Sequence, residues 1–259
     1  MGENYGRPQS NDYCGCGQRR RRKNVVVGNY CKNTCTNLSR QKILAIDADP
    51  AVGLSTALGI EVKHTIDDIR KDVIENVEQG NNKQAIDILN EARFRIYDAL
   101  VETDGFTFIA VGRPESAGCY CKINSYLKDI ISILSEEFDY VVIDGEAGIE
   151  QINRRVMEKV THLILITDTS KKGRDVCATI KNVADNLVMY EKIGVIVNRM
   201  NDEAVLQYLD FDGVPVIATI GDDKNLTKFD LTGENVFNLP DESEVVRGVK
   251  KALSAMKII

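Results

Sequence analysis

Short apolar runs alternate with longer amphipathic stretches along most of this chain. The runs are rich in β-branched residues and are bounded by Gly, Asp or Pro, which is typical of strands buried on both faces. They lie at Ile43–Ile46, Phe106–Val111, Tyr140–Ile143, Leu163–Thr167, Val195–Val197 and Val214–Ile217. Stretches with helical spacing of apolar residues lie between them, at Lys83–Glu102, Ile123–Glu137, Ile149–Val160 and Arg174–Met189.

This alternation predicts an α/β fold. The sheet is expected to be mostly parallel with helices on both faces, because parallel strands need crossover connections. In such a sheet the ligand binds beyond the C-terminal ends of the strands. Residues 242–259 also carry apolar positions at helical spacing, which predicts a helix that covers the sheet.

The first 40 residues do not share this pattern. They hold four of the seven Cys residues, a basic run at 19–23 and many Asn and Gly residues, and only Val25–Val27 is typical of a core. We therefore divide the chain into a Cys- and Arg-rich segment, residues 1–41, and an α/β domain, residues 42–259. The N-terminal segment is expected to be irregular.

Composition narrows the class of protein. The chain is 43% hydrophobic and 28% charged, which is ordinary for a globular protein. The sequence contains neither an apolar run near the ~20 residues of a membrane span nor a stretch of signal-peptide type, so a cytoplasmic location without a membrane partner is expected. The net charge of -6 argues against a nucleic-acid partner. An odd count of seven Cys favours reduced thiols or metal ligands over disulfides.

Carboxylates follow two of the predicted strands. Asp47 and Asp49 come after Ile43–Ile46, and Asp144 comes after Tyr140–Ile143. A single Asp at such a place is equally well explained as the N-cap of the next helix. Two such ends on neighbouring strands favour a nucleotide site with hydrated Mg²⁺, which binds a few carboxylates together with water and phosphate oxygens.

Three further residues belong to the same candidate site. Gly148 permits the loop after the Asp144 strand to approach a ligand closely or to switch. Asn198 and Arg199 end the strand Val195–Val197, and the Asn amide offers a donor and an acceptor to the edge of a purine.

Cys119 and Cys121 follow the strand Phe106–Val111 and a loop with Gly and Pro. Two thiolates are soft ligands for Ni²⁺ or Zn²⁺. Because two ligands do not close a four-coordinate site, a symmetric dimer with one pair per chain completes it. The alternative is that both are small, half-buried residues beside Tyr120.

Together these motifs resemble the deviant P-loop ATPases, a group with the nitrogenase iron protein and the cell-division and plasmid-partition ATPases. The resemblance is carried by Asp47–Pro50, Val141–Gly148 and Val197–Arg199 and covers roughly residues 42–250. The segment Gly112–Cys121 is similar to that of the CooC-type ATPase, which inserts nickel into carbon monoxide dehydrogenase.

The resemblance implies ATP and Mg²⁺ as cofactors, a homodimer, and carbon monoxide dehydrogenase as the client. It also implies roles for individual residues: Asp49 is catalytic and orients the attacking water or the switch, and Asp144 holds Mg²⁺ through water. Asn198 contacts adenine, Asp47, Gly148 and Arg199 belong to the nucleotide site, and Cys119 and Cys121 bind nickel or zinc at the dimer interface.

The phosphate-binding loop of this family, G-x-x-x-x-G-K-[ST], is absent from the sequence, and GQRRRRKN at residues 17–24 stands in its place. Read one base later, these eight codons can encode GKGGVGKT. The same shift turns 11–14 and 29–31 into residues of the Thr, Ile, Met, Ala and Val types. We therefore hypothesise that residues from about 2 to 41 are a frameshifted translation of a strand, loop and helix. The alternative is a genuine, divergent basic N-terminus.

Two other functions stay open from the sequence. A spatial regulator of the cell-division or partition type predicts a basic amphipathic tail or a basic surface, and it leaves Cys119 and Cys121 unexplained. A non-catalytic metal-binding or interaction protein fits the sequence as it stands, because without the phosphate loop ATP binding is in doubt.

Overall fold

The computed structural model describes residues 11–17, 20–37, 41–49, 53–80, 87, 91, 94–112, 121–145, 159–187 and 189–259. Within these ranges the strands are β1 Asn11–Gly17, β2 Ile43–Asp47, β3 Val101–Glu102, β4 Thr107–Ala110, β5 Tyr140–Gly145, β6 Lys159–Thr167, β7 Met189–Asn198 and β8 Val216–Ile220. They form one sheet in the order β3-β4-β2-β5-β1-β6-β7-β8. Every pair is parallel except β3–β4, so the prediction of a mostly parallel sheet is confirmed.

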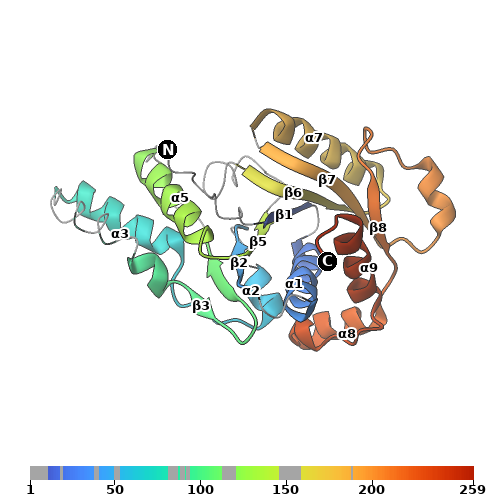
Figure 1. Cartoon of the computed structure of the whole chain (residues 1–259), viewed down its shortest axis with the longest axis horizontal. Coiled ribbons are helices and arrows are strands. Elements are labelled where there is room, and N and C mark those ends of the chain that lie inside the picture. Colours follow the sequence, from blue (N-terminus) through green and yellow to red (C-terminus); the bar gives the residue numbers. More distant parts are fainter. Residues whose placement is uncertain are drawn as a thin grey trace, which may run out of the picture.

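Helices cover both faces of this sheet (Figure 1). Their bounds are α1 Arg20–Asn37, α2 Gly53–Leu58, α3 Ile66–Glu78, α5 Cys121–Ser135, α7 Lys171–Leu187, α8 Lys224–Thr232 and α9 Glu244–Ala255, with short 3-10 helices at Glu203–Tyr208 and Val236–Asn238. The first core lies between the sheet and α3, α5 and α7, and the second lies between the sheet and α1, α2, α8 and α9.

The strands contribute to both cores because successive side chains of a strand point to opposite faces. Leu44 and Ile46 of β2 belong to the first core, whereas Ile43 and Ala45 belong to the second. This explains why the strands are continuous apolar runs in the sequence rather than alternating ones.

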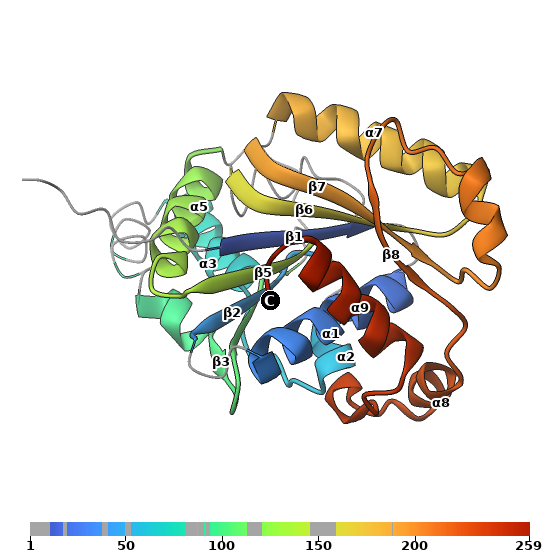
Figure 2. The same ribbon diagram turned by 45° about the vertical axis from the view of Figure 1, so that its right-hand side comes forward.

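The N-terminal segment differs from its predicted irregular structure. β1 lies in the centre of the sheet, between β5 and β6, where Gly15 pairs in register with Asp144 and Ile164 (Figure 2). α1 follows it and packs against α2 and α9. The physical reason is that a central parallel strand needs backbone N–H and C=O groups, which every non-proline residue supplies, and that β5 and β6 leave room for a strand between them.

Two predicted helices also differ from the structure at their ends. Val101 and Glu102 form the edge strand β3 by pairing with Phe108 and Thr107, although the pattern predicted them as the end of a helix. Val160 belongs to β6, and residues 149–158 of the helix predicted there lie outside the described ranges. Pairing with a neighbouring strand overrides local helical spacing in both places.

The C-terminal prediction is confirmed. In α9 the apolar residues Val245, Val246, Val249 and Leu253 are all buried against the sheet. In the part of the chain that the structure describes, each helix is too short or too polar to span a membrane.

Candidate functional site

Two carboxylates meet at the C-terminal edge of the sheet. Asp47 ends β2 and Asp144 lies next to the end of β5, and the two residues pair in register across the parallel strands. Both are fully buried. The backbone N–H of Ala48 donates to the carbonyl oxygen of Asp144 at 2.9 Å, which fixes the start of the loop that carries Asp49. The sequence pattern thus placed these carboxylates at the correct edge of the sheet.

Asp47 acts as the cap of α2. Its Oδ2 accepts the backbone N–H groups of Leu54 at 2.9 Å and Ser55 at 3.4 Å, while Oδ1 accepts the N–H of Asp49 at 3.2 Å. Burial raises the pKa of Asp47 to about 6, and these three N–H groups counteract part of that rise. The helix-cap interpretation therefore accounts for the contacts that Asp47 makes.

Asn24 of α1 approaches this edge from the other side. Its side chain lies against Gly53 so closely that a Cβ added there would come within 1.9 Å of Asn24 Nδ2. Asn24 is 4% exposed, and its buried Oδ1 has no hydrogen-bond partner in the part of the chain that the structure describes. The sequence analysis did not select Asn24 as a site residue, although it stands eighth in the segment 17–24 that replaces the phosphate loop.

The donor set fits Mg²⁺ but not a triphosphate. Carboxylate oxygens suit Mg²⁺, and Asp49 and Asp144 supply them. Among the described residues, no three His, Cys, Asp or Glu side chains gather closely enough to hold a metal ion, so water has to complete the coordination of a bound Mg²⁺. Phosphates need a Gly-rich backbone cradle, whereas α1 begins at Arg20, directly followed by further bulky basic residues.

Asn198 and Arg199 lie at the same edge, at the end of β7. Two strands, β1 and β6, lie between β7 and β5. Asn198 and Asp144 are therefore separated by the width of two strands along the same edge of the sheet. Asn198 is largely buried, and its Oδ1 accepts the N–H of Arg199 at 2.9 Å. Arg199 has a positive φ of 61°, so the chain turns sharply directly after the strand. An elongated ligand is required to reach both Asn198 and the carboxylates.

The sequence analysis missed the residues that join the ends of β7 and β8. Asn201 Nδ2 donates to Asp222 Oδ2 at 2.7 Å, and the N–H of Asp222 donates back to Asn201 Oδ1 at 3.0 Å. Next to this pair, Asp223 caps α8 and also accepts the N–H of Val245 at the start of α9. Two Asp residues between a strand and a helix are a recognisable cap signal.

The cysteine pair is described in part. Cys119 and Gly148 lie outside the described residues, and Cys121 is the first residue of α5. The segment leading to them leaves the sheet beside Asp47, because the N–H of Val111 donates to the carbonyl oxygen of Asp47 at 2.8 Å. Gly112 follows with a φ of 83°, a conformation that favours glycine.

Cys177 was predicted to be a core residue, and it is. It is 3% exposed within α7, and burial raises the pKa of its thiol to about 11. A thiol with so high a pKa is not a thiolate at neutral pH.

Comparisons of the sequence identify its relatives. No protein-family model matches the chain. An uncharacterized ATP-binding protein of Methanocaldococcus jannaschii is 37% identical over 221 residues, which cover 84% of this chain and 87% of the relative. The carbon monoxide dehydrogenase accessory protein CooC of Rhodospirillum rubrum is 24% identical over 212 residues, which cover 74% of this chain and 80% of CooC.

Solved structures share the fold. The cell division ATPase MinD of Pyrococcus furiosus superposes with a TM-score of 0.65 at 18% identity, covering 96% of this chain and 99% of MinD. A ParA family ATPase of Chlorobium tepidum gives a TM-score of 0.64 at 16% identity, covering 94% of this chain and 98% of the other. At these identities the likeness concerns the architecture of the chain.

Proposed function

The chain belongs to the CooC-like group of the deviant P-loop ATPases, and from this membership we propose that it is an ATP-dependent maturation factor that delivers nickel to carbon monoxide dehydrogenase. One structural observation supports the delivery role in particular. The Val111–Asp47 hydrogen bond makes the segment before Cys119 and Cys121 leave the sheet beside the candidate nucleotide site. Cys119 follows Gly112 by seven residues, so only a short stretch of sequence separates the cysteine pair from this edge of the sheet.

In this proposal the residues of the sheet edge divide the work. Asp144 holds Mg²⁺ through water, and Asp49 orients a water or the switch. Asp47 keeps α2 in place as its cap. Asn198 contacts the base at the far end of the same edge, next to Arg199, and Gly148 belongs to the nucleotide site.

Nickel is the cargo in this proposal. Cys119 and Cys121 of two protomers supply four thiolates, which close a four-coordinate site at the interface of a homodimer. Zn²⁺ has the same preference for thiolates and competes for the site. A maturation factor needs such a site to open and close, and a dimer interface does so when the protomers separate.

Metal stoichiometry tests the proposal. We expect one Ni²⁺ per two chains, release of protons as the thiols ionise, and dimer formation with the metal, measured by calorimetry and light scattering. Cys119→Ala and Cys121→Ala abolish all three effects, while Cys177→Ala leaves them unchanged because Cys177 is buried in α7. One ion per monomer that survives loss of both cysteines contradicts the proposal.

Because cysteine thiolates in general bind soft metals, the same titration is repeated with the four N-terminal cysteines, Cys14, Cys16, Cys31 and Cys35, changed to Ser. Client activation is the second measurement. Apo carbon monoxide dehydrogenase mixed with the nickel-loaded protein gains activity above a free-nickel control. Activation equal to that control leaves a metal-binding protein without a delivery role.

A further inference from the structure

The buried side of α1 carries polar residues among the apolar ones that belong to the second core, which are Val25, Val26, Val27, Tyr30 and Cys31. Asn24, Asn29, Asn33 and Thr34 are each at most 6% exposed. Among the described residues, the Oδ1 atoms of Asn24 and Asn29 have no hydrogen-bond partner, although such buried atoms are costly to leave unsatisfied. By contrast, α9, which packs against α1, buries Val245, Val246, Val249, Ala252 and Leu253.

The side-chain amides on this face do not repair the mismatch. Asn29 Nδ2 donates to the carbonyl oxygen of Val25 at 2.9 Å, and Asn33 Nδ2 donates to the carbonyl oxygen of Asn29 at 2.9 Å. Both acceptors lie four residues earlier in the same helix, where backbone N–H groups already use the carbonyl oxygens. These two hydrogen bonds thus both lie within α1.

The codons of a segment rich in Asn, Asp, Tyr and Cys encode mostly apolar or small residues when they are read one base later. Codons for Asn, Asp, Tyr and Cys all end in a pyrimidine, so reading one base later places that pyrimidine in the middle of the codon. A middle pyrimidine encodes apolar or small residues. Of residues 11–36, eleven are Asn, Asp, Tyr or Cys. A segment with this composition becomes apolar when its frame moves by one base.

A one-base shift of the reading frame changes the residues at buried positions of α1. Whatever codons are used, Asn29 and Asn33 become Thr or Ile, and Cys31 becomes Ala or Val. Asn24, with the orphaned Oδ1, becomes Thr or Met. In the central strand β1, residues 11–14 become Met or Thr, then Thr or Ile twice, then Ala or Val, which are residues of a buried strand.

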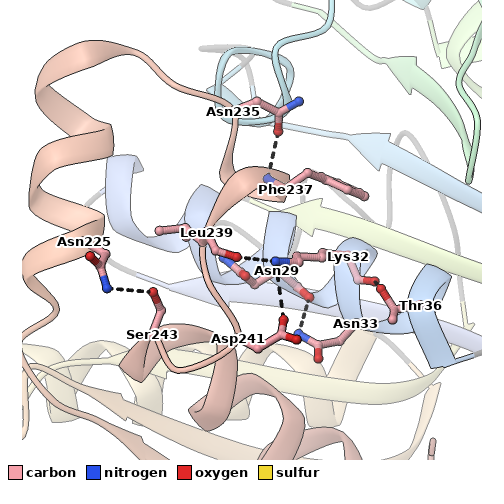
Figure 3. Close-up of polar contacts among 10 residues, drawn as sticks. All are labelled: Asn29, Lys32, Asn33, Thr36, Asn225, Asn235, Phe237, Leu239, Asp241 and Ser243. Carbon is pink, nitrogen blue, oxygen red and sulfur yellow. Dashed lines mark hydrogen bonds and ion pairs between the residues drawn. The ribbon is translucent and has the colours of Figure 1, made fainter.

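One charged residue keeps its character in both frames. Lys32 becomes Lys or Arg, because its shifted codon is completed by the first base of the Asn33 codon. Lys32 Nζ donates to the carbonyl oxygen of Leu239 and lies 3.8 Å from a carboxylate oxygen of Asp241 (Figure 3). The frame shift therefore removes buried polar groups from α1 and retains the basic group that joins the helix to the C-terminal segment.

We infer that the natural protein is encoded one base later than this sequence over residues 11–36. Its α1 then carries Thr, Ile, Met, Ala or Val at the buried positions 24, 29, 31 and 33. Its residues 17–24 can read GKGGVGKT, a sequence that suits a phosphate cradle. The statement about α1 stands on burial and codon structure alone. The statement about the cradle rests on the proposed function.

Nucleic-acid and mass data test the frame directly. The genomic DNA upstream of the Lys42 codon is expected to hold, one base later, an open frame that reads GKGGVGKT at 17–24 and that a single inserted or deleted base near residue 41 joins to the present frame. Peptide masses of the protein isolated from its source are expected to match the shifted translation. A DNA sequence without such a frame, or peptide masses that match the present residues 11–36, overturns the inference.

Thermal unfolding measured without nucleotide tests the reading frame independently of the proposed function. The frame-restored chain is expected to unfold several degrees higher than the present chain, and Asn29→Thr in the present chain is expected to raise the midpoint as well. Asn186→Thr is the matched control, because Asn186 makes the same bond to a carbonyl four residues earlier on the exposed side of α7. Equal effects of the two substitutions contradict the inference.

ATP binding is then measured on both chains by calorimetry with Mg²⁺. We expect binding by the frame-restored chain and none above background by the present chain. A restored chain that is more stable and still does not bind ATP supports the frame and contradicts the proposed function. A restored chain no more stable than the present one, with equal ATP binding by both, contradicts the frame.

Discussion

Asp47 Oδ2 accepts the backbone N–H of Leu54 at 2.9 Å, so the residue that ends β2 also caps the first turn of α2. The same residue pairs in register with Asp144, and its carbonyl oxygen receives the N–H of Val111. Asp47 thus connects β2, β4, β5 and α2 at the edge where the candidate site lies. A change in its charge therefore affects a residue that contacts all four elements.

Asp47 is expected to make the protein less stable as the pH rises from about 4 to about 6. Its pKa of about 6 in the folded chain exceeds the ordinary value of 3.8, because burial favours the neutral form. The folded state therefore binds the proton more tightly, and the stabilisation present below pH 3.8 is lost as the pH rises through 6. Asp47→Asn removes this component, which thermal melts at pH 4.5 and 7 measure. An unchanged pH profile in the variant contradicts the prediction.

His162 is expected to give the opposite pH dependence. It is 6% exposed, its Nε2 lies 3.2 Å from the carbonyl oxygen of Met256, and its pKa is lowered, first by burial and then by Lys192. The folded state holds His162 neutral, so the stabilisation is present above pH 6.5 and is lost as the pH falls below it.

The chain offers a matched control for this experiment. His64 is the other of the chain's two His residues, and its side chain is exposed. His162→Gln is expected to flatten the unfolding free energy between pH 7 and pH 5, whereas His64→Gln leaves the profile as it is. Equal profiles for both variants assign the pH dependence to other groups.

Asp223 is expected to contribute more to stability than its neighbour. Its side chain accepts the N–H groups of Asn225, Leu226 and Val245, so it caps α8 and anchors the start of α9. Asp223→Ala is expected to lower the free energy of unfolding by about 2 kcal/mol, the upper end for a helix cap. Asp222→Ala loses an exposed contact to Asn201 and is expected to cost less than half as much in denaturant titrations.

A side chain added at Gly53 is expected to displace the buried side chain of Asn24. A Cβ at this position would lie 1.9 Å from Asn24 Nδ2, so Gly53→Ala forces Asn24 or α2 to move. The expected loss is about 1–3 kcal/mol in the free energy of unfolding, as for overpacking elsewhere. Gly213→Ala is a control for the loss of glycine, since its added Cβ meets nothing within 4 Å, although its φ of 77° carries a strain of its own. A Gly53→Ala variant as stable as the parent contradicts the contact.

Base contact by Asn198 is tested in the frame-restored chain. Asn198→Ala is expected to weaken ATP binding about tenfold, because one hydrogen bond to the base is lost. Asn201→Ala, which removes the contact to Asp222 farther along the same turn, is expected to have a smaller effect. Equal affinities for ATP in the Asn198 variant and the parent contradict its role.

Much of the fold followed from the sequence because its strands are buried on both faces. Runs such as Leu163–Thr167 and Val195–Val197 have one stable environment, the interior of a parallel sheet. The position of Asp144 at the C-terminal edge followed as well, since the ends of parallel strands meet there. The family relationship also came from local motifs, because the spacing of Asp47, Asp49 and Asp144 relative to their strands is a property of the sequence.

Other features needed the tertiary structure. Val101 and Glu102 continue a helical pattern, yet they form an edge strand because Phe108 and Thr107 offer backbone partners. The role of Asp47 stayed open between cap and ligand until α2 was placed with its first N–H groups on the carboxylate. The contact of Asn201 with Asp222 joins residues that only the pairing of β7 with β8 brings together.

By itself, the sequence determined the parallel sheet, the sheet edge with the candidate site and the absence of a Gly-rich phosphate loop. Each of these depends only on the order of residues close together in the chain. Only the tertiary structure decided that Asn11–Gly17 is the central strand and that Asn24 and Asn29 face a core. The reason is physical: a strand between β5 and β6 is held by backbone hydrogen bonds, which do not depend on side chains, whereas the fit of a buried face depends on every side chain that it encloses.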